Sequence, residues 1–276
     1  MKTLRVNLKG GTGNQLFTFA TAVQCAIQQS RTLILSDFFL KKDKQREFDL
    51  EWLGLQPNIG YFVDLTSGGI QFQSVGKVAE SKDHELFRYD GLPYTQLVIP
   101  VNKESVTLEG YFQSLKFFES ISNEMSAFIR QKLPVISEFK NYNVGQIRLG
   151  DMAHVNQINK IHGYCDDNYW ANAIVEIENG DPFVFVGDDL ESVERFLPQT
   201  YLMIQRMNGE LRESTVPEAI ALIVSSTNRI ISNSTFGWWG AFLAQNGKTI
   251  APKAWFRDKE LNQKTMDLYP KDWILK

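Results

Sequence analysis

Apolar residues alternate with polar ones at the start of the chain and then give way to a run of glycines. Residues 4–8 place leucine or valine at every second position, which predicts a strand, and the glycine-rich turn 10–13 follows directly. Beyond it, apolar residues recur at intervals of three and four over residues 16–27, the spacing of one helix face. A short apolar run at residues 32–35 predicts a second strand. The chain therefore opens with a β-α-β unit.

The rest of the first half is less regular. Residues 43–105 show no long periodic run, and no element is assigned there. Residues 106–113 predict a strand, and residues 115–133 predict a helix that ends before Pro134.

The second half alternates strand-like and helix-like segments. Strands are predicted at residues 144–148, 183–186, 201–204, 229–232 and 249–251, and helices at residues 169–177, 192–196, 218–225 and 237–244. Pro217 stands where a first-turn proline belongs. Strands and helices that alternate in this way form a parallel sheet covered on both faces, so the predicted class is α/β.

The length of 276 residues is typical of two domains at about 150 residues each. The break near residues 134–143 separates the two regular regions. We therefore expect one α/β domain at residues 1–138 and a second at residues 139–276, facing each other across a cleft.

Composition excludes several classes of function. Lys and Arg number 29 against 32 Asp and Glu, so the chain has no overall positive charge to attract nucleic acid. Two cysteines, Cys25 and Cys165, form no disulfide framework and no CxxC pair, which favours a reduced, cytoplasmic setting. No stretch of about 18 apolar residues predicts a membrane span. From Lys248 onward the sequence has seven Lys or Arg and four Asp or Glu. This slight excess of positive charge permits peripheral contact with a membrane surface.

Candidate chemistry follows four of the predicted strands. In an open parallel sheet, ligands bind outside the carboxyl ends of the strands, so the residues just beyond each strand are candidates for a site. These are residues 10–15, 148–151, 187–189 and 233–236.

The glycine turn does not fit the common nucleotide-binding motifs. It lacks the GK[ST] ending of a P-loop, and Leu16 stands where GxGxxG has its third glycine. Gly11 and Gly13 still allow the backbone to approach a ligand closely, and Asn14 and Gln15 offer amide groups. The alternative is a tight connection with Asn14 as the N-cap of the helix.

Charged residues follow two strands of the second half. Arg148 is suited to clamp a phosphate group through two parallel hydrogen bonds, and Asp151 either holds that arginine or acts as a base. The alternative is a structural ion pair. Asp188 and Asp189 fit either a metal site or a strand-end turn in which one carboxylate caps the next helix.

The segment at residues 233–235 precedes a predicted helix. Hydroxyl groups and free backbone N–H groups at a helix N-terminus bind anions, although an ordinary cap followed by buried aromatic residues is the alternative. His154, His162 and Cys165 match no common zinc spacing, and no metal site is expected.

Together these segments resemble the α-1,2-fucosyltransferases of glycosyltransferase family 11. The resemblance is carried by GGTGNQLF at residues 10–17, EGYFQSLKFF at 109–118, QIRLGD at 146–151, HGYC at 162–165, FVFVGDD at 183–189 and IISNSTFGWWGAFL at 230–243. These segments occur in the family's order and cover most of the chain, and the last is the most specific.

The resemblance implies a GT-B fold of two Rossmann-like domains. It also implies inverting transfer of L-fucose from GDP-β-L-fucose to O2 of a terminal galactose, in an oligosaccharide or a lipid-linked glycan, without a metal or other cofactor. The N-terminal domain would bind the acceptor and the C-terminal domain the donor. Arg148 would neutralise the diphosphate, Asp188 or Asp189 would reach the guanosine, and Asn14 would lie near the reacting centre. The remaining donor contacts fall on Gly11, Gly13, Gln146, Asn233, Ser234, Thr235 and Phe236.

Two departures from the family pattern keep alternatives open. Gln146 and Leu149 stand where the family's His-x-Arg-Arg-x-Asp motif has histidine and its second arginine, so phosphate binding rests on fewer charges. A GDP-sugar-binding relative without catalysis and a fucosyltransferase with another acceptor remain alternatives. An NAD-dependent oxidoreductase is disfavoured by the absent third glycine.

Overall fold

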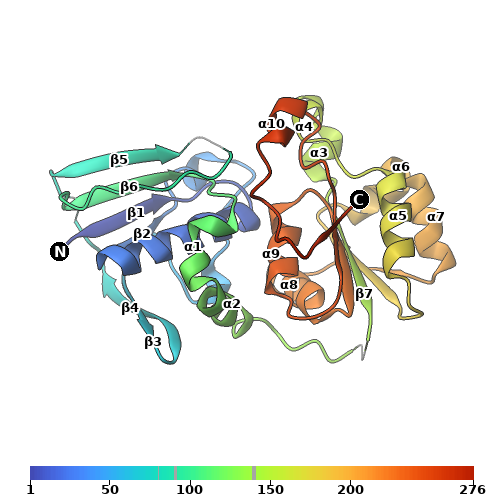
Figure 1. Ribbon diagram of the computed structural model, residues 1–276, viewed down its shortest axis with the longest axis horizontal. Helices are drawn as coiled ribbons and strands as arrows, with labels where there is room; N and C mark the ends of the chain where they lie inside the picture. The colour runs from blue at the N-terminus through green and yellow to red at the C-terminus, as the bar shows by residue number, and fades with distance from the viewer. Residues whose placement is uncertain (80, 90–91, 139–140) are drawn as a thin grey trace. The chain divides into compact units, whose positions relative to one another are not determined.

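The computed structural model describes residues 1–79, 81–89, 92–138 and 141–276 and divides into two compact units (Figure 1). The N-terminal unit comprises residues 1–132 and 266–268, and the C-terminal unit comprises residues 133–265 and 269–276. The predicted boundary between residues 138 and 139 borders residues 139–140, which lie outside the described part. Near the end of the chain, residues 266–268 belong to the N-terminal unit, which the sequence did not suggest. Among the described helices, none is long and apolar enough to cross a bilayer.

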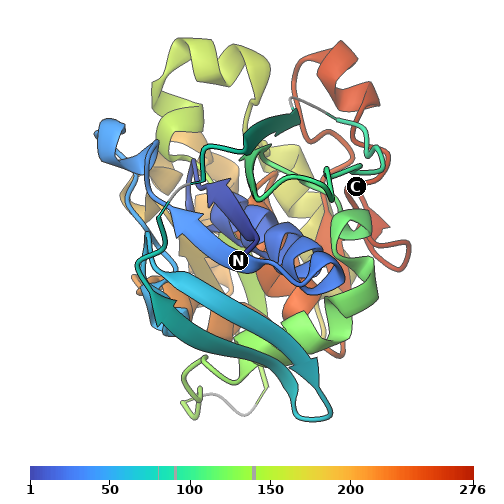
Figure 2. The same ribbon diagram turned by 90° about the vertical axis from the view of Figure 1, so that its left-hand side faces the viewer.

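The N-terminal unit is built on a six-stranded sheet with the order β4-β3-β2-β1-β6-β5. Its strands are β1 (Thr3–Asn7), β2 (Thr32–Ser36), β3 (Gly60–Thr66), β4 (Gly69–Gly76), β5 (His84–Tyr89) and β6 (Ser105–Gly110). The four strands β2, β1, β6 and β5 run parallel, whereas β3 and β4 form an antiparallel hairpin at one edge, in the foreground of Figure 2. The predicted β-α-β opening is therefore confirmed.

Three of these strands lie in the stretch that showed no pattern. β4 and β5 carry mostly exposed or half-buried residues, because both stand at sheet edges. An edge strand buries too little surface to produce a clear hydrophobic alternation.

Helix α1 (Thr12–Gln29) provides most of the core of this unit. Its apolar side chains are buried except for Ile27, which is half-buried, and Ser30 ends it in the left-handed conformation. The helix predicted at residues 115–133 is shorter than expected. It consists of two 3₁₀ turns, Leu115–Phe117 and Glu119–Ile121, followed by α2 (Ser122–Arg130).

The C-terminal unit has a second six-stranded sheet, all parallel, with the order β12-β11-β10-β7-β8-β9. Its strands are β7 (Asn143–Ile147), β8 (Phe183–Gly187), β9 (Glu210–Leu211), β10 (Asn228–Ile231), β11 (Thr249–Ala251) and β12 (Ile274–Leu275). Its helices are α3 (Gly150–His154), α4 (Asn156–Ile161), α5 (Asp167–Ile177), α6 (Val193–Phe196), α7 (Pro198–Arg206), α8 (Val216–Ser225), α9 (Thr235–Leu243) and α10 (Lys259–Gln263), with a 3₁₀ turn at Leu190–Ser192. Two units built on largely parallel sheets confirm the predicted class, α/β with the two Rossmann-like units of a GT-B protein.

The strand predicted at residues 201–204 is wrong, because this segment belongs to α7. Pro198 opens that helix at its first turn. Thr200 and Ile204 are buried four residues apart on one helix face, and the Thr200 N–H and hydroxyl both donate to Asp167 Oδ1. A short apolar run does not by itself distinguish a strand from a buried helix turn. The edge strand is instead β9.

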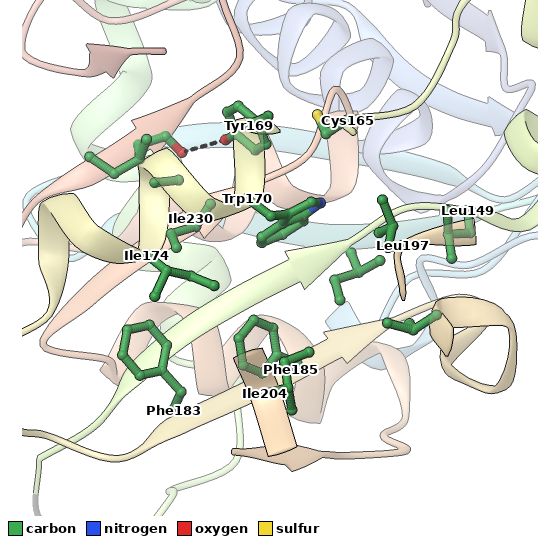
Figure 3. Close-up of a cluster of buried hydrophobic side chains, with 14 of the residues drawn as sticks. Leu149, Cys165, Tyr169, Trp170, Ile174, Phe183, Phe185, Leu197, Ile204 and Ile230 are labelled. Atoms are coloured by element: carbon green, nitrogen blue, oxygen red, sulfur yellow. Dashed lines mark hydrogen bonds between the residues drawn. The ribbon is translucent and has the colours of Figure 1, made fainter. Parts of the chain in front are cut away.

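Aromatic packing holds α5 against the C-terminal sheet (Figure 3). Trp170 is fully buried, with its ring centroid 6.2 Å from that of Phe185 on β8. Phe183 stacks beside Phe185 at 5.9 Å, and Tyr169 donates a hydrogen bond to the carbonyl oxygen of Ile231. This cluster anchors β7, β8 and β10, whose carboxyl ends carry most of the predicted donor-site residues.

We expect Gly145→Ala to destabilise the C-terminal unit. A Cβ atom on Gly145 in β7 would lie 2.4 Å from Phe185 and 3.2 Å from Trp170, so the aromatic cluster must shift. Overpacking of this kind costs about 1–3 kcal/mol, measurable by urea unfolding followed by tryptophan fluorescence. Gly68→Ala is the control, because its added Cβ meets Thr66 Oγ1 at 3.6 Å and Gln71 Nε2 at 4.0 Å, which are ordinary van der Waals contacts. Equal urea midpoints for the two variants would contradict the packing argument.

Candidate active site

The carboxyl ends of three neighbouring strands bring the predicted residues of the C-terminal unit together. In the register of the sheet, Gln146 on β7 pairs with Ile231 on β10, and Ile147 pairs with Gly187 on β8. Since the three strands are parallel, the residues that follow them, Arg148, Asp188 and Ser232, leave the sheet at the same edge.

Arg148 lies between two carboxylates. Its Nη1 donates to Asp188 Oδ2 and its Nη2 to Asp151 Oδ1. The other oxygen of Asp188 accepts a hydrogen bond from the Leu149 N–H at 3.0 Å. The Arg148 side chain is only 18% exposed, so partial burial strengthens these ion pairs. The structure therefore brings three predicted residues into one ionic network, and Asp151 holds the arginine as the ion-pair alternative predicted.

Gly150 allows this network to form. It adopts φ +27°, and a Cβ atom there would lie 2.3 Å from Asp188 Oδ2. Any side chain at this position would displace the carboxylate from Arg148.

Asp189 points to a different partner. Its Oδ2 lies 2.7 Å from His154 Nε2, and Ser192 Oγ lies 3.3 Å from the same ring nitrogen. The adjacent carboxylates thus contact the two ends of one helix: Asp188 lies at the start of α3 and Asp189 at its end.

Ser232 was not singled out from the sequence, yet it joins β10 to β7. Its hydroxyl donates to the carbonyl oxygen of Gln146 at 2.9 Å and accepts from the Arg148 N–H at 3.0 Å. The one feature of the sequence that could have indicated Ser232 is its position as the first residue of the Ser-Asn-Ser-Thr segment.

The Asn233 amide is used within the protein. Its Nδ2 donates to the carbonyl oxygens of His162 (3.1 Å), Gly163 (3.3 Å) and Trp255 (3.1 Å), and its Oδ1 lies 3.7 Å from Cys165 Sγ. The side chain is 4% exposed. Asn233 therefore ties the segments around His162 and Trp255 to the end of β10, and its side-chain amide is used by these internal bonds.

Helix α9 begins beside this junction. Ser234 is its N-cap residue but makes no side-chain cap hydrogen bond, while Thr235 and Phe236 are half-buried in its first turn. Because the first N–H groups of a helix have no partner within it, they are available to an anion. Phe236 packs against the buried cluster around Tyr142 and Val144, and the following tryptophans, Trp238 and Trp239, are fully buried. The aromatic run is thus largely core.

Gln146 has an unsatisfied polar atom at this junction. The side chain is 3% exposed, and its Oε1 has no hydrogen-bond partner in the described structure. The amide lies against α9, since a Cβ atom on Gly237 would be 2.4 Å from Oε1. A buried acceptor without a partner is costly, so Gln146 destabilises the protein at this position unless a ligand or water supplies a donor.

The glycine turn of the N-terminal unit differs in detail from the prediction. Gly11, not Asn14, is the N-cap residue, and Gly13 and Asn14 lie inside the first turn of α1. Gln15 is fully buried, with hydrogen bonds to Gly10 O (3.0 Å), Glu47 O (2.8 Å) and the Asp49 N–H (3.0 Å). It therefore fixes the turn. Asn14 is half-buried, and its Oδ1 accepts from Gln113 Nε2 at 2.6 Å.

Asp49 is a further charged residue at this turn that the sequence did not reveal. It accepts a hydrogen bond from Thr12 Oγ1 at 2.8 Å. Burial raises the pKa of Asp49. No local pattern marks it, because residues 43–49 contact the turn only through the tertiary fold.

Metal ligation has no candidate cluster among the described residues. Burial raises the pKa of Cys165 to about 12, so this thiol remains protonated and is a poor metal ligand.

The hydrogen bonding of the two buried side-chain amides, Gln146 and Asn233, can be tested by a matched pair of substitutions. Gln146→Met removes an acceptor that has no partner, so we expect an unchanged or slightly higher free energy of unfolding. Asn233→Leu removes the side-chain donor from the buried carbonyl oxygens of Gly163 and Trp255, and His162 O keeps only the Arg257 N–H, so the substitution should cost about 1–3 kcal/mol or more. Both are measured by urea unfolding. A larger loss for Gln146→Met than for Asn233→Leu would contradict these hydrogen-bond assignments.

Comparison with known proteins identifies the family of the chain. Residues 83–276 match the model of glycosyl transferase family 11. Similar curated proteins from Escherichia coli are an alpha-1,2-colitosyltransferase, 25% identical over 99% of both chains, and the O-antigen biosynthesis glycosyltransferase WbnK, 28% identical over 97% of this chain and 98% of the relative.

Two solved structures also resemble the chain. A mutant of Arabidopsis thaliana FUT1 in complex with GDP is 10% identical, with a TM-score of 0.47, over 91% of this chain and 70% of that one. The E. coli heptosyltransferase WaaC with ADP is 10% identical, with a TM-score of 0.49. The match covers 100% of this chain and 92% of that one. The family match spans more than half of the sequence, and the chain belongs to glycosyltransferase family 11.

Proposed function

We propose that this glycosyltransferase is an inverting, metal-independent α-1,2-fucosyltransferase. It moves L-fucose from GDP-β-L-fucose to O2 of a terminal galactose in an oligosaccharide or lipid-linked glycan. One observation carries the proposal: Ser232 joins Arg148 to the end of β10, three residues before α9 begins. The backbone of Arg148 and the segment that leads into α9 thus leave the sheet at one edge.

The Arg148 guanidinium and the N-terminus of α9 suit the leaving diphosphate. Glycosyl transfer passes through an oxocarbenium-like transition state while negative charge builds on the leaving group, and preorganised donors stabilise that charge. Arg148 supplies a planar pair of N–H donors, and the first turn of α9 supplies backbone N–H groups. Phosphate oxygens replace one or both carboxylates at Arg148 when the donor binds. The network with Asp151 and Asp188 keeps the guanidinium in place for that exchange.

Asp151 has two roles open to it. An inverting displacement requires a base that takes the proton of the acceptor hydroxyl, and Asp151 is the candidate from the sequence. Its ion pair with Arg148 supports the other role, in which it orients the guanidinium. We propose orientation as its main function. Asp188 and Asp189 serve the guanosine side, and Asn14 acts near the reacting centre.

A second donor is favoured by the similarity to the colitosyltransferase, which extends over 99% of the chain. Colitose is 3-deoxy-L-fucose, so the two sugars differ by one hydroxyl group. The same phosphate chemistry and the same α-1,2 linkage serve both. A relative that binds GDP-sugar without catalysis, and an acceptor other than galactose, are the remaining alternatives.

Membrane contact remains a proposal that fits a lipid-linked acceptor. Part of the basic excess after residue 248 is neutralised, because Lys248 and Lys276 both lie near Glu176, at 3.9 and 2.6 Å. Any attraction to anionic lipid therefore rests on the other basic residues of this segment.

A product-linkage assay tests the function directly. Purified protein is incubated with GDP-fucose or GDP-colitose and with lactose-like and galactosyl-N-acetylhexosamine acceptors, and the products are analysed by NMR. We expect an α-1,2-linked fucoside, formed at the same rate with EDTA present, because Arg148 and α9 carry the phosphate charge. A colitoside alone would establish the second donor. GDP binding without turnover of either donor would support the non-catalytic alternative, and a strict Mg²⁺ or Mn²⁺ requirement would overturn the metal-free mechanism.

Arg148→Ala should abolish transfer in a folded protein. Loss of a preorganised donor to a developing oxyanion costs about 10²–10³-fold in turnover. The comparison is Arg206→Ala, at the exposed end of α7 in the same unit. We expect steady-state rates near wild type for Arg206→Ala and a melting temperature close to wild type for both. Near-normal turnover of Arg148→Ala would remove its phosphate role.

A further inference from the structure

The carboxyl edge of the N-terminal sheet carries a row of side chains that the donor chemistry does not use. Ser36 on β2 and Glu109 on β6 both pair with Asn7 on β1. Across the edge, in the strand order β2, β1, β6, the residues two positions beyond these partners are Phe38, Lys9 and Tyr111. All three follow the carboxyl ends of parallel strands, so they leave the sheet at the same edge.

The two aromatic residues of this row are unusually exposed. Phe38 is 50% and Tyr111 is 42% exposed, although most other aromatic side chains of this unit are buried or half-buried. Each carries an ammonium group over its ring: Lys9 Nζ lies 4.3 Å from the Tyr111 centroid, and Lys42 Nζ lies 3.9 Å from the Phe38 centroid. Exposed aromatic surface rimmed by polar groups marks a binding site.

Lys9 has no carboxylate partner within the described parts of the chain. The carboxylate that ends β6, Glu109, is already occupied by other partners. Its Oε1 accepts from Asn7 Nδ2 at 2.8 Å, and its Oε2 pairs with Arg88 at 2.9 Å. Within the described residues, the contact recorded for the Lys9 ammonium is the Tyr111 ring, which leaves its N–H groups available as donors.

A strained turn presents Tyr111. The next residue, Phe112, adopts φ +48°, which is rare for an aromatic residue, and its ring is fully buried between Tyr89 (5.5 Å) and Phe117 (5.4 Å). Gly110 is required beside it, because a Cβ atom there would lie 2.7 Å from the carbonyl oxygen of Tyr89. Packing thus overrides the backbone preference.

The strained turn has a clear structural result. It turns the Phe112 ring into the core and leaves Tyr111 exposed, while Gln113 reaches Asn14 in the glycine turn at 2.6 Å. Backbone strain that persists under such packing is a mark of functional positions.

We propose that Tyr111, Lys9 and Phe38 form the subsite for the acceptor sugar, with the Tyr111 ring as its stacking platform. This inference rests on the proposed function. The apolar C–H face of a pyranose packs on an aromatic ring, and its hydroxyl groups accept hydrogen bonds from the Lys9 ammonium and the Asn14 amide. Burial and the nearby Asp43 raise the pKa of Tyr111, so its hydroxyl stays protonated and is a further donor.

The test compares acceptor and donor kinetics in Tyr111 variants. Tyr111→Ala should raise KM for the galactoside about tenfold and leave KM for the nucleotide sugar unchanged. Tyr111→Phe, which keeps the ring, should restore most of the acceptor affinity. The matched control is Phe62→Ala, because Phe62 is 47% exposed on β3, away from this edge. Melting temperatures show that each variant is folded.

Direct binding separates this inference from the proposed function. Titration of the galactoside into protein saturated with GDP, followed by NMR line broadening, measures acceptor affinity without turnover. Weaker binding by Tyr111→Ala than by Phe62→Ala supports the subsite even if neither sugar donor is transferred. Wild-type acceptor affinity in Tyr111→Ala would overturn the subsite and leave the proposed transfer activity standing.

Discussion

The parallel register of β7 with β8 and β10 is the constraint on which the donor side depends. It sets Arg148, Asp188 and Ser232 at one edge, where the Ser232 hydroxyl bridges two strands and the guanidinium meets two carboxylates. A slip of one residue would turn these side chains to the wrong face. The register is in turn held by the aromatic packing of Trp170 and Phe185, so the core and the site depend on the same strands.

The same principle operates in the N-terminal unit with different chemistry. There the register of β2, β1 and β6 aligns two aromatic rings and a lysine, whereas the C-terminal edge gathers an arginine and acids. One edge is suited to a phosphate group, and the other offers an apolar ring face with hydrogen-bond donors. The proposed transfer of a sugar from a charged donor to a neutral acceptor would use both kinds of surface, each formed by the residues that follow the strands of one sheet.

Much of this was predictable from local sequence. The alternation at residues 4–8, the glycine turn and the helix after it follow from spacing alone, and so do most strands of the second half. The edge strands of the first half could not be predicted, because an edge strand buries too few residues to show a hydrophobic pattern. The helix that contains residues 201–204 could not be predicted either, because a short apolar run fits a strand as well as a helix. Among the site residues, the strand-end positions of Arg148, Asp151 and Asp188 predicted their proximity, whereas Asp49 and Gln113 had no local signal.

The sequence by itself determined which residues leave the strands at the binding edges, because strand ends are set by local pattern and by glycine. Only the tertiary structure decided which of those side chains remain available. Gln15 and Asn233 have the same amide chemistry as Asn14, yet both are consumed by backbone partners that lie far along the chain. Arg148 is paired on both sides, and Tyr111 is exposed because Phe112 is forced inward. The physical reason is that hydrogen bonds and burial are settled by neighbours in space, which local spacing does not specify.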